Sequence, residues 1–281
     1  GVVSNGQIAV EFLKKTKSVD LMILDMEMPI MNGIETIKAV REFNRKIVII
    51  VFSSLTLNGA ELTLQALDLG ANDFVTKQEA SSAINLASSL KMIEATLVPK
   101  INAFEKVLKI GKHKEFYQKT STANECASNA DFNVDENLIV DMNNCLKNMI
   151  DAPQLVLIAS STGGPEALSS IFERITENAQ IPILLVQHMP PIFTKKLAEM
   201  LNKKCPHVIV KEAEDGEIMK PGVCYIAPGD FHMTLSRALR IRLDQEDKVS
   251  YVRPSATVLF ESVYNNYIAK TLSLILTGMG D

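Results

Sequence analysis

A serine-containing turn in the second half of the chain has the composition of a nucleophilic site. An apolar run at residues 155–158 leads into the sequence Ala-Ser-Ser-Thr-Gly-Gly-Pro, and a helix-like pattern follows. Glycine lets the backbone approach a ligand closely. The free N–H groups at the start of a helix can face a developing negative charge. The serine before Thr-Gly-Gly, Ser161, is therefore a candidate nucleophile.

A serine nucleophile needs a base, and the chain contains four histidines. His188 directly follows the segment LLVQ, so we expect it at the carboxyl end of another strand, close to Ser161. His232, in the segment APGDFHM, is a second candidate that would line the same pocket. Placement at a strand end favours His188. The other two, His113 and His207, fit a solvated or structural role better.

A third group should orient the base and stabilise its cationic form. The apolar run 272–276 leads into Thr-Gly-Met-Gly-Asp, which brings Asp281 to a further strand end. The order serine, histidine, aspartate differs from that of α/β-hydrolases, and their GxSxG motif is absent. The alternative interpretation is a glycine-rich turn that only binds phosphate. Without a Walker lysine or a GxGxxG motif, nucleotide binding is the weaker interpretation.

Three polar residues in the first third of the chain form a second candidate site. Asp25, Ser53 and Lys77 each stand at the end of a strand-like run. Strand ends of a parallel sheet converge where such sheets bind ligands. A carboxylate, a hydroxyl and an ammonium there suit phosphoryl transfer onto Asp25 with a divalent cation. Taken singly, each residue is better explained as a polar side chain at a solvated junction between strand and loop.

The elements that must position these residues form two α/β blocks. Continuous apolar runs alternate with helical patterns in both blocks, which predicts two doubly wound parallel sheets with both faces covered. We expect a flavodoxin-like domain over residues 1–95, a polar linker with a helical start over 96–152, and a Rossmann-like domain over 153–281. The expected strands are 21–24, 47–52, 74–75, 155–158, 183–186, 207–210, 224–227 and 272–276.

Composition excludes several function classes. The chain has 281 residues, 47% of them hydrophobic and 22% charged, with a formal net charge of −4. Because there is no block of like charges, we expect no nucleic-acid partner. Since no apolar run reaches about 18 residues, we expect no membrane insertion. The four cysteines lack CxxC spacing and suit free thiols in the cytoplasm.

The first block resembles the receiver domain of two-component response regulators. The segments LDMEMPIMNG, VFSSLT and LGANDFVTK occur in the order of that family. The resemblance implies that Asp25 is the phosphoacceptor, Ser53 the phosphoryl-sensing hydroxyl and Lys77 the switch lysine. It also implies a Mg²⁺ ion bound by Asp25 and the backbone carbonyl of Glu27. The family's acidic pair, which completes the metal site, is expected before Gly1, so we expect an N-terminal truncation.

The second block resembles the catalytic domain of the CheB family, the chemotaxis protein-glutamate methylesterases. The segments IASSTGGPEAL, VQHMPPIFTKKLAEML, GVCYIAPGDFHM, RPSATVLFESV and LILTGMGD carry the resemblance. It implies that the nucleophile is Ser161 and not Ser160, and that the base is His188. Thr162 and Met279 fall on positions next to the active site of the family.

The resemblance places the acid of the triad differently from the strand-end argument. In the family, one variable residue separates Thr-Gly-Met-Gly from the catalytic aspartate. Asp281 occupies the variable position, so the triad aspartate is expected one residue further on, and we expect a C-terminal truncation. Because the given chain contains neither this acid nor the metal-binding pair, a second hypothesis is that it acts as a signalling or binding module without catalysis. A DNA-binding output is disfavoured because no helix-turn-helix pattern or basic patch is present.

The resemblance implies hydrolysis of glutamate methyl esters on chemotaxis receptors, with glutamine deamidation in some members. A chemotaxis histidine kinase would phosphorylate Asp25, and the esterase itself would need no cofactor. Phosphorylation should move the receiver away from an active-site mouth that it covers at rest. Residues 80–110, with their amphipathic pattern, are our candidate part of that docking surface.

Overall fold

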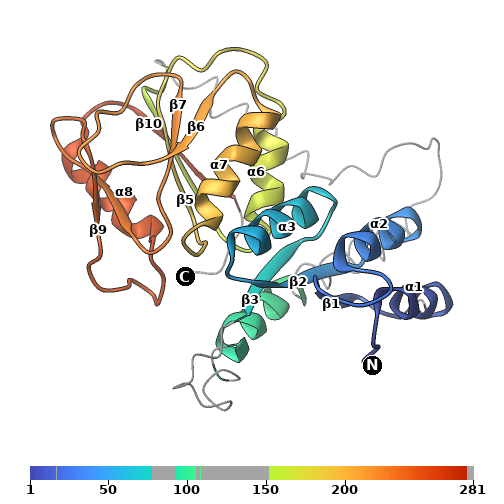
Figure 1. Ribbon diagram of the computed structural model, residues 1–281. Coiled ribbons are helices and arrows are strands. Elements are labelled where there is room, and N and C mark those ends of the chain that lie inside the picture. The colour runs from blue at the N-terminus through green and yellow to red at the C-terminus, as the bar shows by residue number, and fades with distance from the viewer. Residues whose placement is uncertain (17, 78–90, 92, 106–107, 109–151, 277–281) are drawn as a thin grey trace, which may run out of the picture.

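The structure, a computed structural model, describes residues 1–16, 18–77, 91, 93–105, 108 and 152–276. Most of the expected linker lies outside the described residues, as do His113, Met279 and Asp281. The described chain forms two α/β blocks, each built on a parallel sheet (Figure 1). The expected fold class is therefore confirmed.

The first block is a three-stranded parallel sheet in the order β1-β2-β3. Its strands are β1 (Leu21–Asp25), β2 (Val48–Ser54) and β3 (Asp73–Lys77). Its helices are α1 (Gly6–Lys15), α2 (Gly33–Phe43) and α3 (Leu57–Asp68). The starts of the helices follow from local capping: the Asn32 side chain accepts from the Glu35 N–H, and the Thr56 hydroxyl accepts from the Gly59 N–H.

The apolar face of the helical segment 93–105 covers the sheet of its own block. Val48, Ile50 and Val75 point to one side of this sheet and form a buried cluster. The side chains packed on the cluster include Leu97, Ile101, Phe104 and Leu108. These apolar residues are therefore part of the first block's core, which corrects our expectation that they form a docking face. The earlier part of that expected surface, residues 78–90, lies outside the described residues.

The second block has a five-stranded parallel sheet in the order β10-β4-β5-β7-β6. The strands are β4 (Leu155–Ser160), β5 (Ile183–Gln187), β6 (Ile209–Glu212), β7 (Val223–Ile226) and β10 (Thr271–Ile275). The helices are α6 (Gly164–Phe172), α7 (Phe193–Lys204) and α8 (Ala256–Asn266). All five expected strands are present; the third starts two residues later than expected, so His207 precedes it.

A small hairpin in the second block was not expected from the sequence. β8 (His232–Leu235) and β9 (Ile241–Asp244) pair antiparallel, outside the main sheet. Each strand has only four residues, too few to show a clear alternation. Met233, Leu235 and Ile241 are nevertheless buried, in one cluster with residues of β4 and β5. The hairpin thus covers one face of the main sheet.

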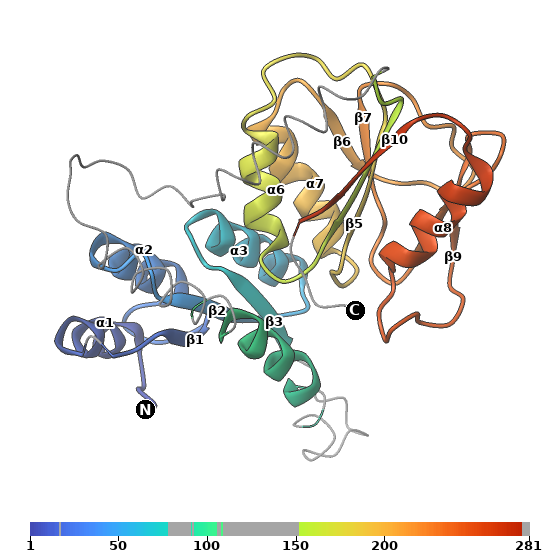
Figure 2. The same cartoon turned by 180° about the vertical axis from the view of Figure 1, so that it is seen from behind.

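The two blocks touch through α3, which packs against α7 and α6 (Figures 1 and 2). The rings of Phe74 on β3 and Phe193 at the start of α7 are stacked, with centroids 4.8 Å apart and an interplanar angle of 3°. Both rings belong to a buried cluster that continues from one block into the other. No helix in the described part of the chain is long and apolar enough to span a membrane.

Candidate active site

The turn between β4 and α6 places Ser161 at the carboxyl end of the sheet. β4 ends at Ser160, and α6 begins at Gly164. Gly163 between them has a φ of +74°, a conformation that favours glycine. Ser161 is 9% exposed and lies at the entrance to α6. The strand, turn and helix expected around this serine are therefore present, with the N–H groups of α6 close to it.

His188 lies at the neighbouring strand end. β4 and β5 are adjacent and parallel, with Ser160 opposite Gln187. The His188 N–H donates to the Ser160 carbonyl at 3.2 Å. The structure thus brings the backbone of the expected base beside that of the expected nucleophile, because parallel neighbours end at the same edge of the sheet.

Burial and a nearby cation keep the imidazole of His188 neutral. Burial lowers the pKa of His188, and the positive charge of Lys100 lowers it further. Lys100 belongs to the helical segment after the first block and is paired with Asp73 at 2.7 Å. A neutral imidazole is the form that can accept a proton from a serine hydroxyl.

The Thr162 hydroxyl is a buried polar group without a partner. The side chain is 6% exposed, and its Oγ1 makes no hydrogen bond within the described residues. A buried hydroxyl in this state is uncommon and calls for an explanation. Because Thr162 directly follows Ser161, this hydroxyl lies next to the candidate nucleophile.

β10 points a third strand end toward the same turn. It pairs parallel with β4 on the side opposite β5, and the Leu276 N–H donates to the Ala159 carbonyl at 3.0 Å. Leu276, the last described residue, therefore lies beside the end of β4 that leads into Ser161. Met279 and Asp281 follow from there but lie outside the described residues.

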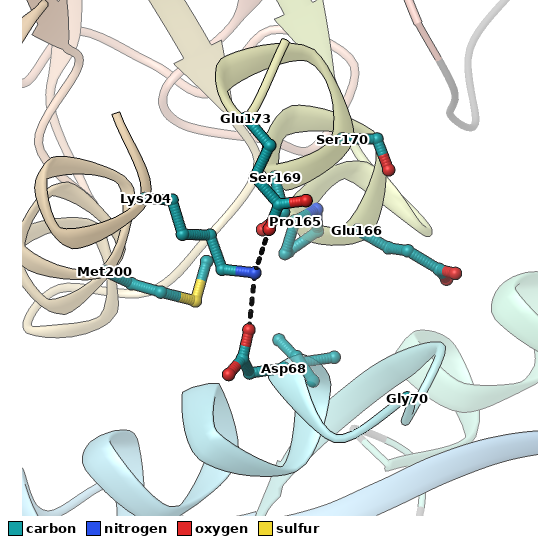
Figure 3. A pocket seen from close by; sticks show the side chains of 10 residues that line it. Asp68, Gly70, Pro165, Glu166, Ser169, Ser170, Glu173, Met200 and Lys204 are labelled. Atoms are coloured by element: carbon teal, nitrogen blue, oxygen red, sulfur yellow. Dashed lines mark hydrogen bonds and ion pairs between the residues drawn. The ribbon is translucent and has the colours of Figure 1, made fainter. Parts of the chain in front are cut away.

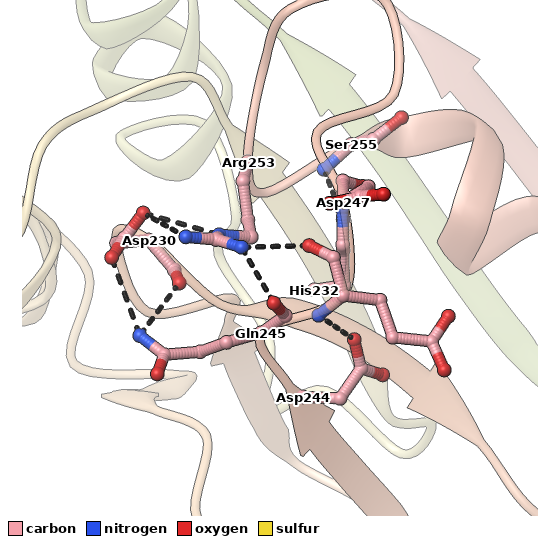
Figure 4. Close-up of polar contacts among 8 residues, drawn as sticks. Asp230, His232, Asp244, Gln245, Asp247, Arg253 and Ser255 are labelled. Carbon is pink, nitrogen blue, oxygen red and sulfur yellow. Dashed lines mark hydrogen bonds and ion pairs between the residues drawn. The ribbon is translucent and has the colours of Figure 1, made fainter.

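The other histidine that we considered for the base is structural. His232 is 1% exposed; its Nδ1 accepts from the Ser255 N–H at 3.2 Å, and its Nε2 faces the Asp247 carbonyl at 3.1 Å. Because Nδ1 is the acceptor, Nε2 carries the proton and donates to that carbonyl. Figure 4 shows this histidine beside an ion pair of Arg253 with Asp230. With both nitrogens used, His232 supports the hairpin, which favours His188 as the base.

The candidate phosphorylation site lies where β1, β2 and β3 end. The Lys77 ammonium contacts the two carboxylate oxygens of Asp25 at 2.7 and 2.9 Å, and the Glu27 N–H donates to Asp25 Oδ1 at 3.1 Å. The buried Ser53 hydroxyl donates to the Gly59 carbonyl in the first turn of α3, at 3.0 Å. The structure thus gathers the three residues at one edge of the sheet and connects Ser53 to the helix that touches the second block.

A polar contact between Asn72 and Glu166 joins the blocks near the nucleophile turn. The Asn72 side chain donates to the Glu166 carboxylate at 3.5 Å, and Arg41 donates to Asn72 at 3.1 Å. Burial raises the pKa of Glu166, although the hydrogen bond from Asn72 and the charge of Arg41 oppose this. Glu166 lies in the first turn of α6. The first block therefore contacts the helix that begins at the nucleophile turn.

A cleft between the blocks holds a lysine shared by both. Lys204 at the end of α7 contacts Asp68 of α3 at 2.5 Å and Glu173 of its own block at 2.6 Å (Figure 3). Lys196, about two turns earlier in α7, lies 3.8 Å from Glu61 of α3. These contacts and the stacked phenylalanines hold α3 on α7. The sequence does not predict these contacts, because periodicity within a helix does not identify its distant partner.

The fold and its two strand-end sites define a response regulator whose receiver domain is joined to a second, enzyme-like α/β domain. Residues 1–88 match the family model of the response regulator receiver domain, and residues 156–281 match that of the CheB methylesterase. The chain is 37% identical to the protein-glutamate methylesterase/protein-glutamine glutaminase of Desulfotalea psychrophila, over 100% of this chain and 75% of that protein. It therefore belongs to this family, the CheB methylesterases.

The chain is also similar to a second relative and to a solved structure. The protein of the same name from Trichodesmium erythraeum is 37% identical, over 100% of this chain and 74% of that protein. The crystal structure of the Thermotoga maritima CheB methylesterase catalytic domain is 46% identical over 47% of this chain and 70% of that chain, with a TM-score of 0.43.

Proposed function

We propose that this chain is a phosphorylation-regulated serine esterase that hydrolyses glutamate methyl esters on chemotaxis receptors. The observation that carries the proposal is the position of Ser161 and His188 on adjacent parallel strand ends, with Ser161 at the start of α6. Relatives named protein-glutamate methylesterase/protein-glutamine glutaminase support the ester substrate, and they support glutamine deamidation as a second reaction.

The arrangement suits acyl transfer in two steps. His188 takes the proton of the Ser161 hydroxyl while its oxygen attacks the ester carbonyl. The N–H groups at the start of α6 face the negative charge that develops on the carbonyl oxygen. The protonated His188 then gives its proton to the departing methanol, and water hydrolyses the acyl-enzyme.

We further propose that Asp25 of the receiver accepts a phosphoryl group from a chemotaxis histidine kinase. A carboxylate and a backbone carbonyl are ligands that Mg²⁺ prefers, and Asp25 with the carbonyl of Glu27 would supply two of them. Bound there, Mg²⁺ would offset the negative charge of the transferring phosphoryl group. Lys77, already 2.7 Å from Asp25, and the Ser53 hydroxyl would bind phosphoryl oxygens.

The contacts of α3 support control of the esterase by the receiver. To bind a phosphoryl group, the Ser53 hydroxyl must leave the Gly59 carbonyl, to which it donates at the start of α3. This change would loosen the packing of α3 on α6 and α7. The receiver would then move away from the entrance to the active site at Ser161. On this proposal, the receiver extends past its expected end at residue 95 to include the helical segment 93–105. The esterase domain spans the expected residues 153–281, and the protein acts on the receptors' cytoplasmic helices.

The test is release of methanol from methylated receptor by the full-length protein. We expect Ser161→Ala to lose release, whereas Ser170→Ala, which changes an exposed serine of α6, should retain it. Equal release from the native protein and Ser161→Ala would contradict the mechanism. Absence of release from the native protein as well would favour a signalling module without catalysis.

A further inference from the structure

We infer that the side chain of Gln187 is a positioning residue that holds the nucleophile turn in place for attack by Ser161. This inference rests on the proposed function, because it assigns Gln187 a role that acts through the proposed nucleophile. Gln187 is the last residue of β5, directly before His188, and it is 2% exposed. It follows four buried apolar residues, so an amide here needs a specific reason.

Both ends of the Gln187 amide bind the turn. Its Oε1 accepts from the Ser160 hydroxyl at 2.6 Å, and its Nε2 donates to the Ser161 carbonyl at 2.9 Å. The orientation of the amide is fixed by chemistry, because a carbonyl can only accept and must therefore face the NH₂ group. The amide thus connects the strand of the proposed base to two successive residues of the turn.

The turn is shaped around this side chain. A Cβ added to Gly164 would lie 2.0 Å from Gln187 Oε1, so only glycine leaves room for the amide at the start of α6. The Ser161 carbonyl also accepts from the Gly164 N–H at 2.9 Å, which closes the turn. The carbonyl of the proposed nucleophile therefore has two donors, one from its own turn and one from the neighbouring strand.

The consequence for catalysis is the direction of the Ser161 hydroxyl. The carbonyls of Ser160 and Ser161 lie in the two peptide planes that flank the Ser161 Cα, and holding both planes fixes the direction in which its side chain leaves the backbone. The hydrogen bond from the His188 N–H to the Ser160 carbonyl, at 3.2 Å, holds the same two strand ends together. Loss of the amide would leave this bond but reduce the donors to the Ser161 carbonyl from two to one, so the carbonyl would be held less firmly. A displacement of about 1 Å at a reacting group can cost about 100-fold in rate.

The test compares two removals of an amide in the full-length protein. Gln187→Met keeps an unbranched side chain of similar length and loses both hydrogen bonds. The control is Asn202→Leu in α7. It removes an amide that donates to the Val210 carbonyl and accepts from the Val210 N–H. Methanol release is measured against receptor concentration, with thermal unfolding of each variant recorded beside it.

We expect Gln187→Met to lower kcat by roughly 10- to 100-fold with KM within about threefold of the native value. Asn202→Leu should leave kcat unchanged. Gln187→Glu keeps the acceptor toward Ser160 but, when ionised, turns an oxygen toward the Ser161 carbonyl, so it should lose at least as much. Gln187→Glu also tests the inference if Gln187→Met does not fold.

A native kcat in a folded Gln187 variant, or an equal fall in kcat for Asn202→Leu, would overturn the inference. Its failure can be told apart from failure of the proposed function by Ser161→Ala. If Ser161→Ala is inactive and Gln187→Met is fully active, only the role of Gln187 is refuted. If Ser161→Ala is fully active, the proposed nucleophile itself is wrong.

Discussion

The stacked rings of Phe74 and Phe193 allow the control of the esterase by the receiver to be tested with one substitution. Phe74→Leu keeps an apolar side chain in the buried cluster around β3 but removes the ring that lies 4.8 Å from Phe193. The substitution should weaken the contact between the blocks and leave the phosphorylation site unchanged. We therefore expect higher methanol release from the unphosphorylated protein.

The size of the increase follows from the energy of the ring pair. Aromatic pairs contribute about 0.5–1.5 kcal/mol beyond the area that they bury. If the two blocks are mainly docked at rest, losing that energy raises the undocked fraction by about 2- to 13-fold. Basal methanol release should rise by the same factor, up to the rate of the phosphorylated protein. Release after phosphorylation should change little, because the contact is then already broken.

The assay measures methanol release from methylated receptor with and without a small-molecule phosphodonor. Val75→Ala is the matched control: Val75 is buried in the same strand but packs with Val48 and Ile50 on the other face of the sheet. It should destabilise the receiver without raising basal release. Unchanged basal release in a folded Phe74→Leu protein, or an equal rise in Val75→Ala, would refute the regulatory role of the ring contact.

Three further predictions concern charges. Asp68→Asn removes the partner of Lys204 in the first block and should raise basal release by roughly 1.5- to 5-fold. Glu173→Gln removes the partner of Lys204 within the second block and should not raise it. A rise in basal release for Glu173→Gln but not for Asp68→Asn would contradict the docking contact. Lys100→Met should raise the pKa of His188, so the acidic limb of the pH profile of kcat/KM should move to higher pH, and Lys100→Arg should leave it in place. Asp25→Asn should abolish stimulation by the phosphodonor but keep basal release; stimulation that persists would exclude this phosphoacceptor.

Much of the fold follows from the sequence because each element has a local cause. The continuous apolar runs before Asp25 and Ser161 predict buried parallel strands, and such strands end at one edge of the sheet. This reasoning brings Ser161 to His188 without knowledge of any long-range contact. Strand-end placement already favours His188 over His232, and the hydrogen bonds of His232 add that both its nitrogens are used.

Contacts between distant surfaces could not be predicted in the same way. The amphipathic pattern of residues 93–105 shows that one helix face is buried but does not say against what, and it covers the sheet of its own block. The pairing of Phe74 with Phe193 depends on how two separately folded blocks meet. Gln187 was within reach of sequence reasoning, because a glutamine after four apolar residues of a buried strand must find hydrogen-bond partners.

The central claim is that Ser161 hydrolyses a methyl ester under the control of Asp25. The most direct measurement is methanol release from methylated receptor by the native protein and by Ser161→Ala, each with and without the phosphodonor. We expect release by the native protein that rises on phosphorylation, and none above background from Ser161→Ala in either condition. Equal release from the two proteins would contradict the account.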